Sequence, residues 1–339
     1  MLIQEMVDLK DFSTMKLGGK TRFFAVVKNT DDVLEAIRFV KEKNIPVHIL
    51  GGGSNTIFGD FTFPGLTIKI EINEIFKKQI DETTVLLFSG AGVSWDELVA
   101  YTVENGLSGV EALSSIPGSV GGTPVQNVGA YGQEVGETIE SVEVVDIVSG
   151  EIKILSNKDC AFSYRDSIFK NEVKGRYVIT HVTFKLSTLP PKIPHYPGVK
   201  EYFDTKGIAN PTLSDIRGAI TEIRKNKLPD PREIASCGSF FKNPFVDEAT
   251  YLKIKKRYPG LKYFEMEDGT YKIPAGWILE TLGYKGKIIG NFEFYKNNAL
   301  VLVNKGGGDK EELETLIKEV QEKVQKEFGI LIEPEPVFM

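Results

Sequence analysis

Three glycine-rich segments in the N-terminal half of the chain carry the backbone groups best suited to hold an anion. They are residues 51–55 (Gly-Gly-Gly-Ser-Asn), 118–122 (Gly-Ser-Val-Gly-Gly) and 129–132 (Gly-Ala-Tyr-Gly). Because glycine has no Cβ, such a loop can bring successive N–H groups close to a bound anion and adopt positive φ. A single glycine loop is more often a plain turn, but three in one half of a chain favour a cradle for a pyrophosphate or an extended nucleotide.

Two common nucleotide-binding motifs do not fit these loops. Gly19-Lys20-Thr21 resembles the end of a Walker loop, but Thr14 occupies the position of the first glycine of that motif. The Gly90-Ala91-Gly92 run follows a strand pattern, as a Rossmann fingerprint does, but Trp95 replaces the third glycine and would obstruct close packing of helix on strand. We therefore expect a dinucleotide to be held in neither manner.

Composition and charge exclude several classes of protein. Cys160 and Cys237, the only cysteines, cannot build a tetrahedral thiolate site, and the three histidines show no ligand spacing, so we expect no metal centre. With 41 Lys and Arg against 47 Asp and Glu, the net charge of −6 lacks the basic footprint of a nucleic-acid-binding protein. No apolar run is long enough to cross a bilayer, and residues 1–13 do not form a signal segment. We expect a cytoplasmic, monomeric protein with no membrane insertion and no nucleic-acid partner.

The elements that must position the glycine loops follow from the hydrophobic periodicity. Thr30 or Asp31 is expected to cap a helix, and a buried strand over residues 46–50 then leads straight into the first loop. The pattern also predicts strands over 84–89, 139–148, 151–155 and 178–185, and helices over about 94–105, 215–225 and from Asp309 to the C-cap Gly329. Residues 187–214 are rich in proline and turn residues, and we expect a linker or a long binding loop there.

Longer motifs point to one family. They include ILGGGSN (49–55), SSIPGSVGGTPVQNVGAYGQE (114–134), CAFSYRDSIFK (160–170), GSFFKNP (238–244) and IEPEPVF (332–338). With these motifs in this order, the chain resembles the UDP-N-acetylenolpyruvoylglucosamine reductase family over nearly its whole length. The long proline-rich segment with Tyr196 is similar to the longer of the two forms of that family, in which a tyrosine on a loop closes over the uridine diphosphate.

The resemblance implies a fold and a domain organisation. The fold is α+β, with a vanillyl-alcohol-oxidase-type (PCMH-type) FAD-binding domain followed by a smaller α/β substrate-binding domain. The FAD-binding domain is expected over residues 16–187, in two subdomains with a break near 70–80, and a proline-rich loop or linker over 188–214. The C-terminal substrate-binding domain is expected over 215–339, with its last strand returning toward the flavin site.

The resemblance also implies a reaction. FAD and NADPH would serve in the reduction of UDP-N-acetylglucosamine enolpyruvate to UDP-N-acetylmuramate, a step of peptidoglycan precursor synthesis. Hydride would reach the β-carbon of the enol ether through FAD, and a proton would then reach the α-carbon. Such chemistry needs fixed positive charge at the substrate carboxylate, a proton donor at the α-carbon and protection of the flavin from water.

Three residues match the catalytic positions of the family. Arg165 would hold the carboxylate, although an isolated Arg-Asp pair with Asp166 would by itself indicate a structural salt bridge. Ser239 would donate the proton, whereas the neighbouring Cys237 lies outside the motif and is expected to be a buried filler. Glu335 would hydrogen-bond the carboxylate, and Glu333 competes with it for this role because spacing alone does not decide between them.

The remaining matches concern the cofactor and the substrate. FAD would be held by two of the glycine loops, through Gly51, Gly52, Gly53, Ser54, Asn55, Gly118, Ser119, Gly121 and Gly122. The uridine diphosphate would be contacted by Tyr196, Lys227 and Asn243. The chain departs from the family pattern at residues 290–293 (Gly-Asn-Phe-Glu), which puts the substrate contacts expected there in doubt.

Two other functions stay open from the sequence. One is an oxidase or dehydrogenase of the same flavin fold that acts on another substrate, and loss of Arg165, Ser239 and Glu335 would have favoured it. The other is a non-redox protein that binds a nucleotide sugar and has lost its flavin. The colour of the purified protein separates the last of these from the enzymes.

Overall fold

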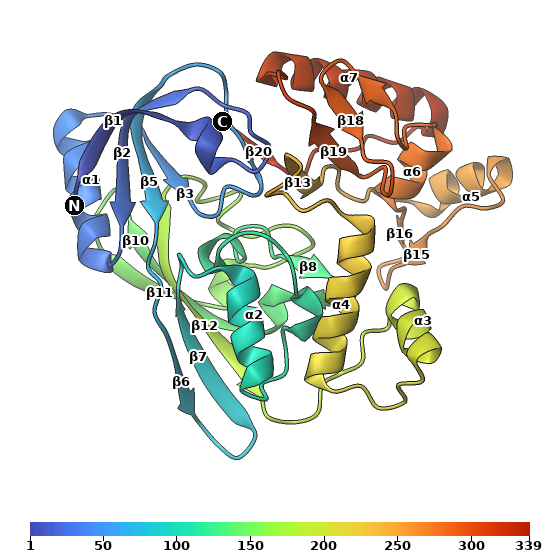
Figure 1. The fold of residues 1–339 in the computed structure, drawn as a ribbon, viewed down its shortest axis with the longest axis horizontal. Coiled ribbons are helices and arrows are strands. Elements are labelled where there is room, and N and C mark those ends of the chain that lie inside the picture. The colour runs from blue at the N-terminus through green and yellow to red at the C-terminus, as the bar shows by residue number, and fades with distance from the viewer. The chain divides into compact units, whose positions relative to one another are not determined.

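The structure is a computed structural model that describes residues 1–339 (Figure 1). Its contacts divide the chain into two compact units. Unit 1 consists of Met1–Val7, Thr21–Gly53 and Thr62–Lys225. Unit 2 consists of Asp8–Lys20, Ser54–Phe61 and Asn226–Met339. Each unit is therefore assembled from three stretches of chain. The domain boundaries expected from the sequence stay a prediction.

The first sheet of unit 1 leads the chain into the first glycine loop. Its order is β1-β2-β5-β3, and β2 (Lys20–Val27) and β3 (Val47–Leu50) both run parallel to β5 (Phe63–Ile70), with β1 (Ile3–Asp8) at the edge. Helix α1 (Thr30–Lys43) joins β2 to β3 and buries the predicted apolar stripe. The N-cap is Asn29, which accepts from the Asp32 N–H, so the expectation of Thr30 or Asp31 was wrong by one residue. Asparagine serves this position as well as aspartate does.

The second sheet of unit 1 is antiparallel, in the order β11-β10-β12-β7-β6. Its strands are β6 (Ile75–Gln79), β7 (Thr84–Gly90), β10 (Ile139–Asp146), β11 (Ile152–Ser156) and β12 (Tyr177–Ser187). These bounds confirm the four strands that the sequence predicts within this sheet. Helix α2 (Trp95–Glu104) follows β7, again as predicted.

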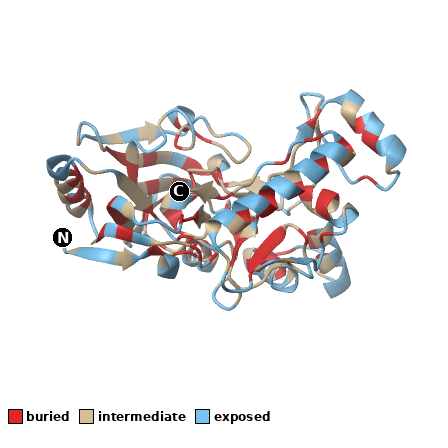
Figure 2. Ribbon diagram, turned by 90° about the horizontal axis from the view of Figure 1, so that it is seen from above, coloured by how far each residue is buried: buried red, intermediate tan, exposed pale blue.

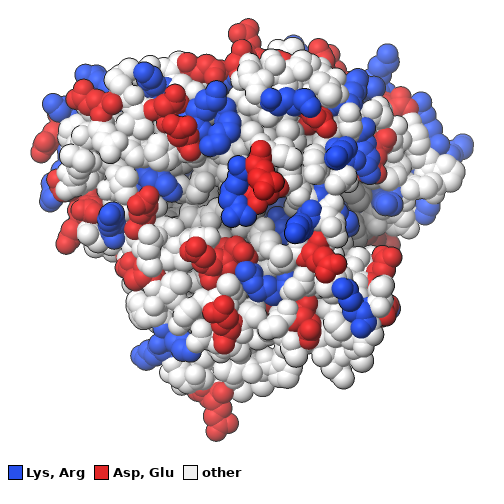
Figure 3. Space-filling model, viewed as in Figure 1, with Lys and Arg blue, Asp and Glu red and all other residues white.

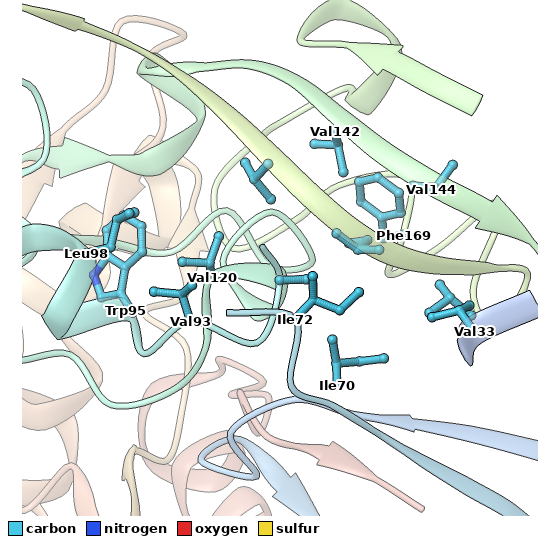
Figure 4. Packing of buried hydrophobic residues seen from close by; sticks show 14 of the residues in the cluster. Val33, Ile70, Ile72, Val93, Trp95, Leu98, Val120, Val142, Val144 and Phe169 are labelled. Atoms are coloured by element: carbon cyan, nitrogen blue, oxygen red, sulfur yellow. The ribbon is translucent and has the colours of Figure 1, made fainter. Parts of the chain in front are cut away.

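One hydrophobic core serves both sheets and the loops between them. Val33 of α1, Ile70 of β5, Val142 and Val144 of β10 and Phe169 belong to the same buried cluster (Figure 4). Trp95 is also buried in it, and its indole N–H donates to the Leu113 carbonyl at 2.9 Å. The start of α2 is thus filled by a large ring, in agreement with the exclusion of a Rossmann site.

Residues 187–214 contain a helix that the sequence did not predict. Helix α3 (Pro197–Lys206) begins with proline in its first turn and ends at Gly207, which has φ 69°. Proline and glycine at these two positions are favourable helix ends, although in the sequence they resemble loop residues. Helix α3 packs through Val199 and Phe203 on α4 (Leu213–Lys227), with which it forms a small separate core. The expected loop or linker is therefore interrupted by ordered structure.

Unit 2 is built around the sheet β13-β19-β18-β17. Its strands are β13 (Ser236–Ser239), β17 (Ile288–Ile289), β18 (Phe292–Phe294) and β19 (Val301–Asn304). Smaller elements complete it: β14 (Phe245–Val246), α5 (Glu248–Arg257), β15 (Phe264–Glu265), β16 (Tyr271–Lys272), α6 (Ala275–Thr281), and the parallel pair β4 (Thr56–Ile57) and β20 (Val337–Phe338).

The last helix confirms its prediction in detail. Helix α7 (Lys310–Phe328) is capped by Asp309, which accepts from the Glu312 N–H, and ends at Gly329 with φ 72°. The predicted apolar stripe is buried in the core of unit 2, and it comprises Leu313, Leu316, Ile317, Val320, Val324 and Phe328. In Figure 2 the helices alternate between buried and exposed colours, as helices with one apolar face do. None of the helices is both long and apolar enough to cross a bilayer.

Candidate active site

The first two glycine loops touch each other in unit 1. A Cβ built on Gly52 would lie 2.7 Å from the Cα of Gly118, and one built on Gly51 would lie 2.6 Å from the Ser119 Oγ. The Gly52 contact is with backbone and is too short for any other residue, so it requires glycine, whereas the atom next to Gly51 is a hydroxyl at the end of a side chain. The structure thus brings residues 51–53 and 118–122 together, as expected for a cradle.

The second loop is anchored to the core and to the Gly90–Gly92 segment. Val120 is buried beside Val93 (Figure 4), and its N–H donates to the Val93 carbonyl at 2.8 Å. The Gly121 N–H donates to the Ala91 carbonyl at 2.9 Å, and a Cβ on Gly121 would lie 2.6 Å from the Ala91 Cβ. The Gly90–Gly92 segment therefore supports a glycine loop, and does not form a Rossmann turn itself.

Ser119 carries a polar atom with no partner at the contact of the two loops. Ser119 is 5% exposed, and its Oγ is buried without a hydrogen bond. A buried hydroxyl left in this way costs about 1–3 kcal/mol. The Ser119 hydroxyl is therefore available to a ligand placed against the glycine loops.

Ser54 and Asn55, which continue the first loop, belong to unit 2. Asn55 accepts from the Val337 N–H at 2.9 Å, and its side-chain amide donates to the Glu335 carbonyl at 3.4 Å. These bonds lie beside the β4–β20 pair. The expected cofactor residues are thus divided between the two units at Gly53.

Arg165 projects from a tight turn over residues 163–166 in unit 1. The Ser163 N–H donates to the Asp166 carbonyl at 3.2 Å, and the Asp166 N–H donates to the Ser163 carbonyl at 3.1 Å. Arg165 has φ 56°, an uncommon conformation for a residue with a side chain, which is found preferentially at functional sites. Its Nη2 donates to the Gly129 carbonyl at 2.6 Å. The guanidinium therefore lies against the third glycine segment.

Asn127 fixes this turn to the third glycine segment. Asn127 is 2% exposed, and its Nδ2 donates to the Glu134 Oε2 at 2.7 Å and to the Ser163 carbonyl at 2.9 Å. Its Oδ1 accepts from the Gly136 N–H at 2.9 Å. Asn127 thus holds both ends of the β8 (Gly129–Ala130) and β9 (Gln133–Glu134) hairpin and the start of the Arg165 turn.

Tyr196 lies against Tyr131, which contacts an arginine outside the sequence motifs. The two tyrosine rings are 5.1 Å apart in an edge-to-face arrangement. The Tyr131 phenol hydrogen-bonds Arg224 of α4, whose Nε donates to the Ser115 carbonyl at 3.1 Å. Burial raises the pKa of Tyr131 and lowers the pKa of Arg224. The signal for Arg224 was its spacing, because it follows the buried Ile216 and Ile220 at intervals of one helical turn.

In unit 2, Ser239 and Glu335 are positioned by adjacent backbone pairs. Ser239 ends β13 opposite Val301 of β19, after a register shift and after Gly238 with φ 73°. Such a bulge re-aims the side chain that follows it. The Glu335 N–H donates to the Phe240 carbonyl at 2.8 Å, so Glu335 pairs with the residue directly after Ser239.

The competing Glu333 has a different environment. Its backbone carbonyl accepts from the Lys242 N–H at 2.9 Å, and its carboxylate forms an ion pair with the Lys242 Nζ at 2.9 Å. The Glu333 side chain is 63% exposed, whereas Glu335 is half-buried. Glu333 therefore resembles an ordinary surface charge.

Cys237 is buried, and burial raises the pKa of its thiol to about 12, with a smaller contribution from the charge of Glu335. The thiol keeps its proton near neutral pH. This environment agrees with the expected role of Cys237 as a small core residue.

The other two expected substrate residues belong to unit 2. Lys227 is the exposed last residue of α4. The Asn243 Oδ1 accepts from the Ala275 N–H at the start of α6 at 2.9 Å, which directs the donor end of this amide away from the helix. Residues 290–293, which depart from the family pattern, make contacts within unit 2. Asn291 donates two hydrogen bonds to the Glu312 carboxylate of α7, and Phe292 is buried.

Comparison with known proteins identifies the family. A curated relative named UDP-N-acetylenolpyruvoylglucosamine reductase, from Ralstonia nicotianae, is 42% identical over 96% of both chains. Another of the same name, from Flavobacterium johnsoniae, is 40% identical over 99% of both. This chain belongs to the UDP-N-acetylenolpyruvoylglucosamine reductase family. Residues 21–156 match the model of an FAD binding domain, and residues 230–339 match that of the C-terminal domain of UDP-N-acetylenolpyruvoylglucosamine reductase.

The fold agrees with a solved structure of the same name. The enzyme from Thermus caldophilus superposes with a TM-score of 0.68 at 24% identity, over 99% of both chains. Together with the two family models, this confirms the expected α+β class, an FAD-binding domain followed by the C-terminal domain of the reductase family.

The glycine loops fit FAD. Both lie inside the matched FAD binding domain, they present backbone where a Cβ would collide, and they meet at the buried hydroxyl of Ser119. A diphosphate needs such N–H groups and hydroxyl donors.

Proposed function

We propose that this protein reduces UDP-N-acetylglucosamine enolpyruvate to UDP-N-acetylmuramate with FAD and NADPH, in peptidoglycan precursor synthesis. The observation that carries the proposal is the similarity to reductases of that name at 36–42% identity over nearly the full chain. The FAD binding domain supports the cofactor. When bound, FAD supplies the transfer of hydride from NADPH to the enolpyruvyl double bond.

Arg165 holds the carboxylate of the substrate. A guanidinium stays charged and offers two parallel N–H groups to a carboxylate. Fixed positive charge of this kind stabilises the negative charge that spreads onto the carboxylate when the β-carbon has received hydride. The Gly129 carbonyl and Asn127 support this role because they hold the Arg165 turn in one conformation.

Ser239 donates the proton to the α-carbon, and Glu335 hydrogen-bonds the carboxylate. A serine hydroxyl is a very weak acid, so only a strongly basic carbon centre takes its proton. The half-buried position of Glu335 beside Phe240 supports it over Glu333, which Lys242 neutralises at the surface.

FAD is held through Gly51, Gly52, Gly53, Ser54, Asn55, Gly118, Ser119, Gly121 and Gly122. The uridine diphosphate is bound by Tyr196, Lys227 and Asn243. Lys227 brings charge to a phosphate, and Asn243 offers an amide N–H group because its oxygen is engaged by α6. The edge-to-face contact with Tyr131 supports an ordered position for Tyr196.

The enzyme works as a cytoplasmic monomer. Its location follows from the soluble nucleotide-sugar substrate and NADPH, and sedimentation of the purified protein tests its oligomeric state.

Absorbance spectroscopy tests the function in two steps. The purified protein is expected to be yellow, to lose the flavin absorbance on mixing with NADPH, and to regain it on adding the enolpyruvyl sugar. A flavin that NADPH reduces but the sugar does not reoxidise would favour another flavin enzyme. A colourless protein that binds the sugar would favour the non-redox binder.

A further inference from the structure

Lys69 is a half-buried lysine in the parallel sheet of unit 1. It lies in β5, between the buried Ile68 and Ile70, and aligns with Leu50 on β3. Leu50 is the last residue before the first glycine loop. Lys69 is therefore close to the carboxyl edge of the parallel strands, where ligands of such sheets bind.

The ammonium group of Lys69 is directed at the first glycine loop. Its Nζ donates to the Gly51 carbonyl at 2.6 Å. Burial lowers the pKa of Lys69, and the charge of Glu71 opposes this effect. Burying an ammonium is unfavourable, and an apolar residue is the usual occupant of such a strand position. The charge at this position therefore calls for a function.

The contact with Lys69 also orients the loop. The chain has no cis peptide bonds, and in a trans peptide the carbonyl and the following N–H point in opposite directions. A Gly51 carbonyl held by Lys69 therefore turns the Gly52 N–H to the opposite side of that peptide. Without the ammonium, this peptide would lose the hydrogen bond that fixes its orientation, and neither Gly51 nor Gly52 has a side chain to restrict it further.

We propose that Lys69 is a positioning residue for the FAD diphosphate, which fixes the Gly51–Gly52 peptide and supplies positive charge behind it. The inference rests on the FAD-binding part of the proposed function. It assigns a role to a residue outside the glycine motifs, and that role is distinct from those of Arg165, Ser239 and Glu335.

Three substitutions separate charge from hydrogen bonding. Lys69→Met keeps the length of the side chain and loses both the charge and the donor. Lys69→Gln keeps an N–H donor without charge, and Lys69→Arg keeps both. The matched control is Lys41→Met, because the exposed Lys41 also donates to a backbone carbonyl, that of Val148 at 2.7 Å, away from the glycine loops.

The measurement is the titration of each flavin-free protein with FAD, followed by flavin fluorescence at several salt concentrations. Loss of a charged hydrogen bond is expected to weaken FAD binding of Lys69→Met by about 10- to 100-fold. Lys69→Gln should fall between Lys69→Met and the wild type, and Lys69→Arg and Lys41→Met should stay near the wild type. FAD affinity should depend less on salt in Lys69→Met and Lys69→Gln than in the wild type. Riboflavin, which has no phosphate, should bind all variants alike.

Several results would overturn the inference. One is an FAD affinity of Lys69→Met within about twofold of the wild type, far below the loss expected of a charged hydrogen bond. Another is an equal loss of riboflavin and FAD binding, which would indicate a general structural defect. If the Met variant does not fold, Lys69→Gln decides, and wild-type affinity and salt dependence in that variant contradict the role. A wild type that binds FAD but does not reduce the sugar would refute the proposed function and leave this inference standing.

Discussion

At the scale of single residues, the roles of the two glutamates at the C-terminal end are separated by their surroundings. Glu335 pairs through its backbone with the residue after Ser239, whereas Glu333 forms an exposed ion pair with Lys242. The sequence motif contains both glutamates and does not distinguish them, because their surroundings depend on which residues pair with this segment in the fold. Arg165 and Ser239 could be proposed from the motifs. Arg224 is marked in the sequence only by its spacing in a predicted helix, and Lys69 is not marked at all, since their partners come from segments distant in the sequence.

The two glutamates provide a matched pair of variants. We expect Glu335→Gln to slow the reoxidation of the flavin by the enolpyruvyl sugar by about tenfold or more, since a charge or proton at the substrate carboxylate is altered. Glu333→Gln should leave this rate unchanged and cost no more than about 1 kcal/mol of stability, as exposed ion pairs do. Stopped-flow absorbance measures the rates. A slow Glu333→Gln with a normal Glu335→Gln would reverse the assignment.

At the scale of elements, periodicity predicts helices whose signals lie within one stretch of sequence, but it does not predict helices that are stabilised by contacts with other segments. The stripe of α7, with Asp309 and Gly329 at its ends, could be identified because all its signals lie within one stretch of sequence. Helix α3 was missed because its end residues, Pro197 and Gly207, resemble those of a loop, and its stability comes from packing on α4. The sequence predicts that the glycine loops share a function, but it does not predict that two of them touch each other.

The bonds of Asn127 make it the residue that orders the Arg165 turn. Asn127→Asp has nearly the same shape but loses both donors and places a carboxylate against Glu134 and the Ser163 carbonyl. We expect a loss of stability of about 1–3 kcal/mol and slower flavin reoxidation by the sugar, with the NADPH step unchanged. Denaturant unfolding and stopped-flow absorbance measure these effects.

A double-mutant cycle tests whether Asn127 acts through Arg165. In the Arg165→Ala background, Asn127→Asp should slow the sugar-dependent step no further, because the group it positions is absent. Additive effects on that rate would contradict the positioning role.

His181 links β12 to β10 and to the segment before β6. Its Nδ1 and Nε2 each lie 2.8 Å from a carboxylate oxygen, of Glu143 and Glu74 respectively. The hydrogen bond with Glu143, above all, raises the pKa of His181. A raised pKa means that the stabilisation is fully present below the unfolded value of about 6.5 and is lost as the pH rises through the folded value.

The expected consequence is a pH-dependent free energy of unfolding. The wild type should lose stability relative to His181→Gln as the pH rises above about 6.5, and denaturant titrations at several pH values measure the difference. A difference that does not change with pH, or that grows with pH, would show that His181 is not bound in its charged form.

At the scale of the whole molecule, each unit draws on distant parts of the chain. Met15 and Leu17, near the N-terminus, are buried in the core of unit 2 together with residues of α6 and α7. Such interleaving is not readable from the sequence, because nothing local marks a segment as belonging to a distant core. Lys, Arg, Asp and Glu are interspersed on the face shown in Figure 3.

Leu17→Ala tests this interleaving. Removal of a buried leucine side chain is expected to destabilise unit 2 by about 2–5 kcal/mol. Hydrogen exchange should therefore report faster opening in residues 226–339, with less effect on residues 62–225. Leu2→Ala, at an exposed position of unit 1, is the control. Equal loss of protection in both units would mean that they unfold as one.

Ser239 is proposed to supply the proton after hydride has reached the β-carbon, and this role can be tested directly. The direct measurement is stopped-flow absorbance of the flavin in Ser239→Ala, first with NADPH and then with the enolpyruvyl sugar, beside Cys237→Ala as the control for the neighbouring buried thiol. We expect a normal first step and a second step slowed by about a hundredfold or more in Ser239→Ala, and two normal steps in Cys237→Ala. A Ser239→Ala enzyme that slows both steps equally, or reoxidises at the wild-type rate, would contradict it.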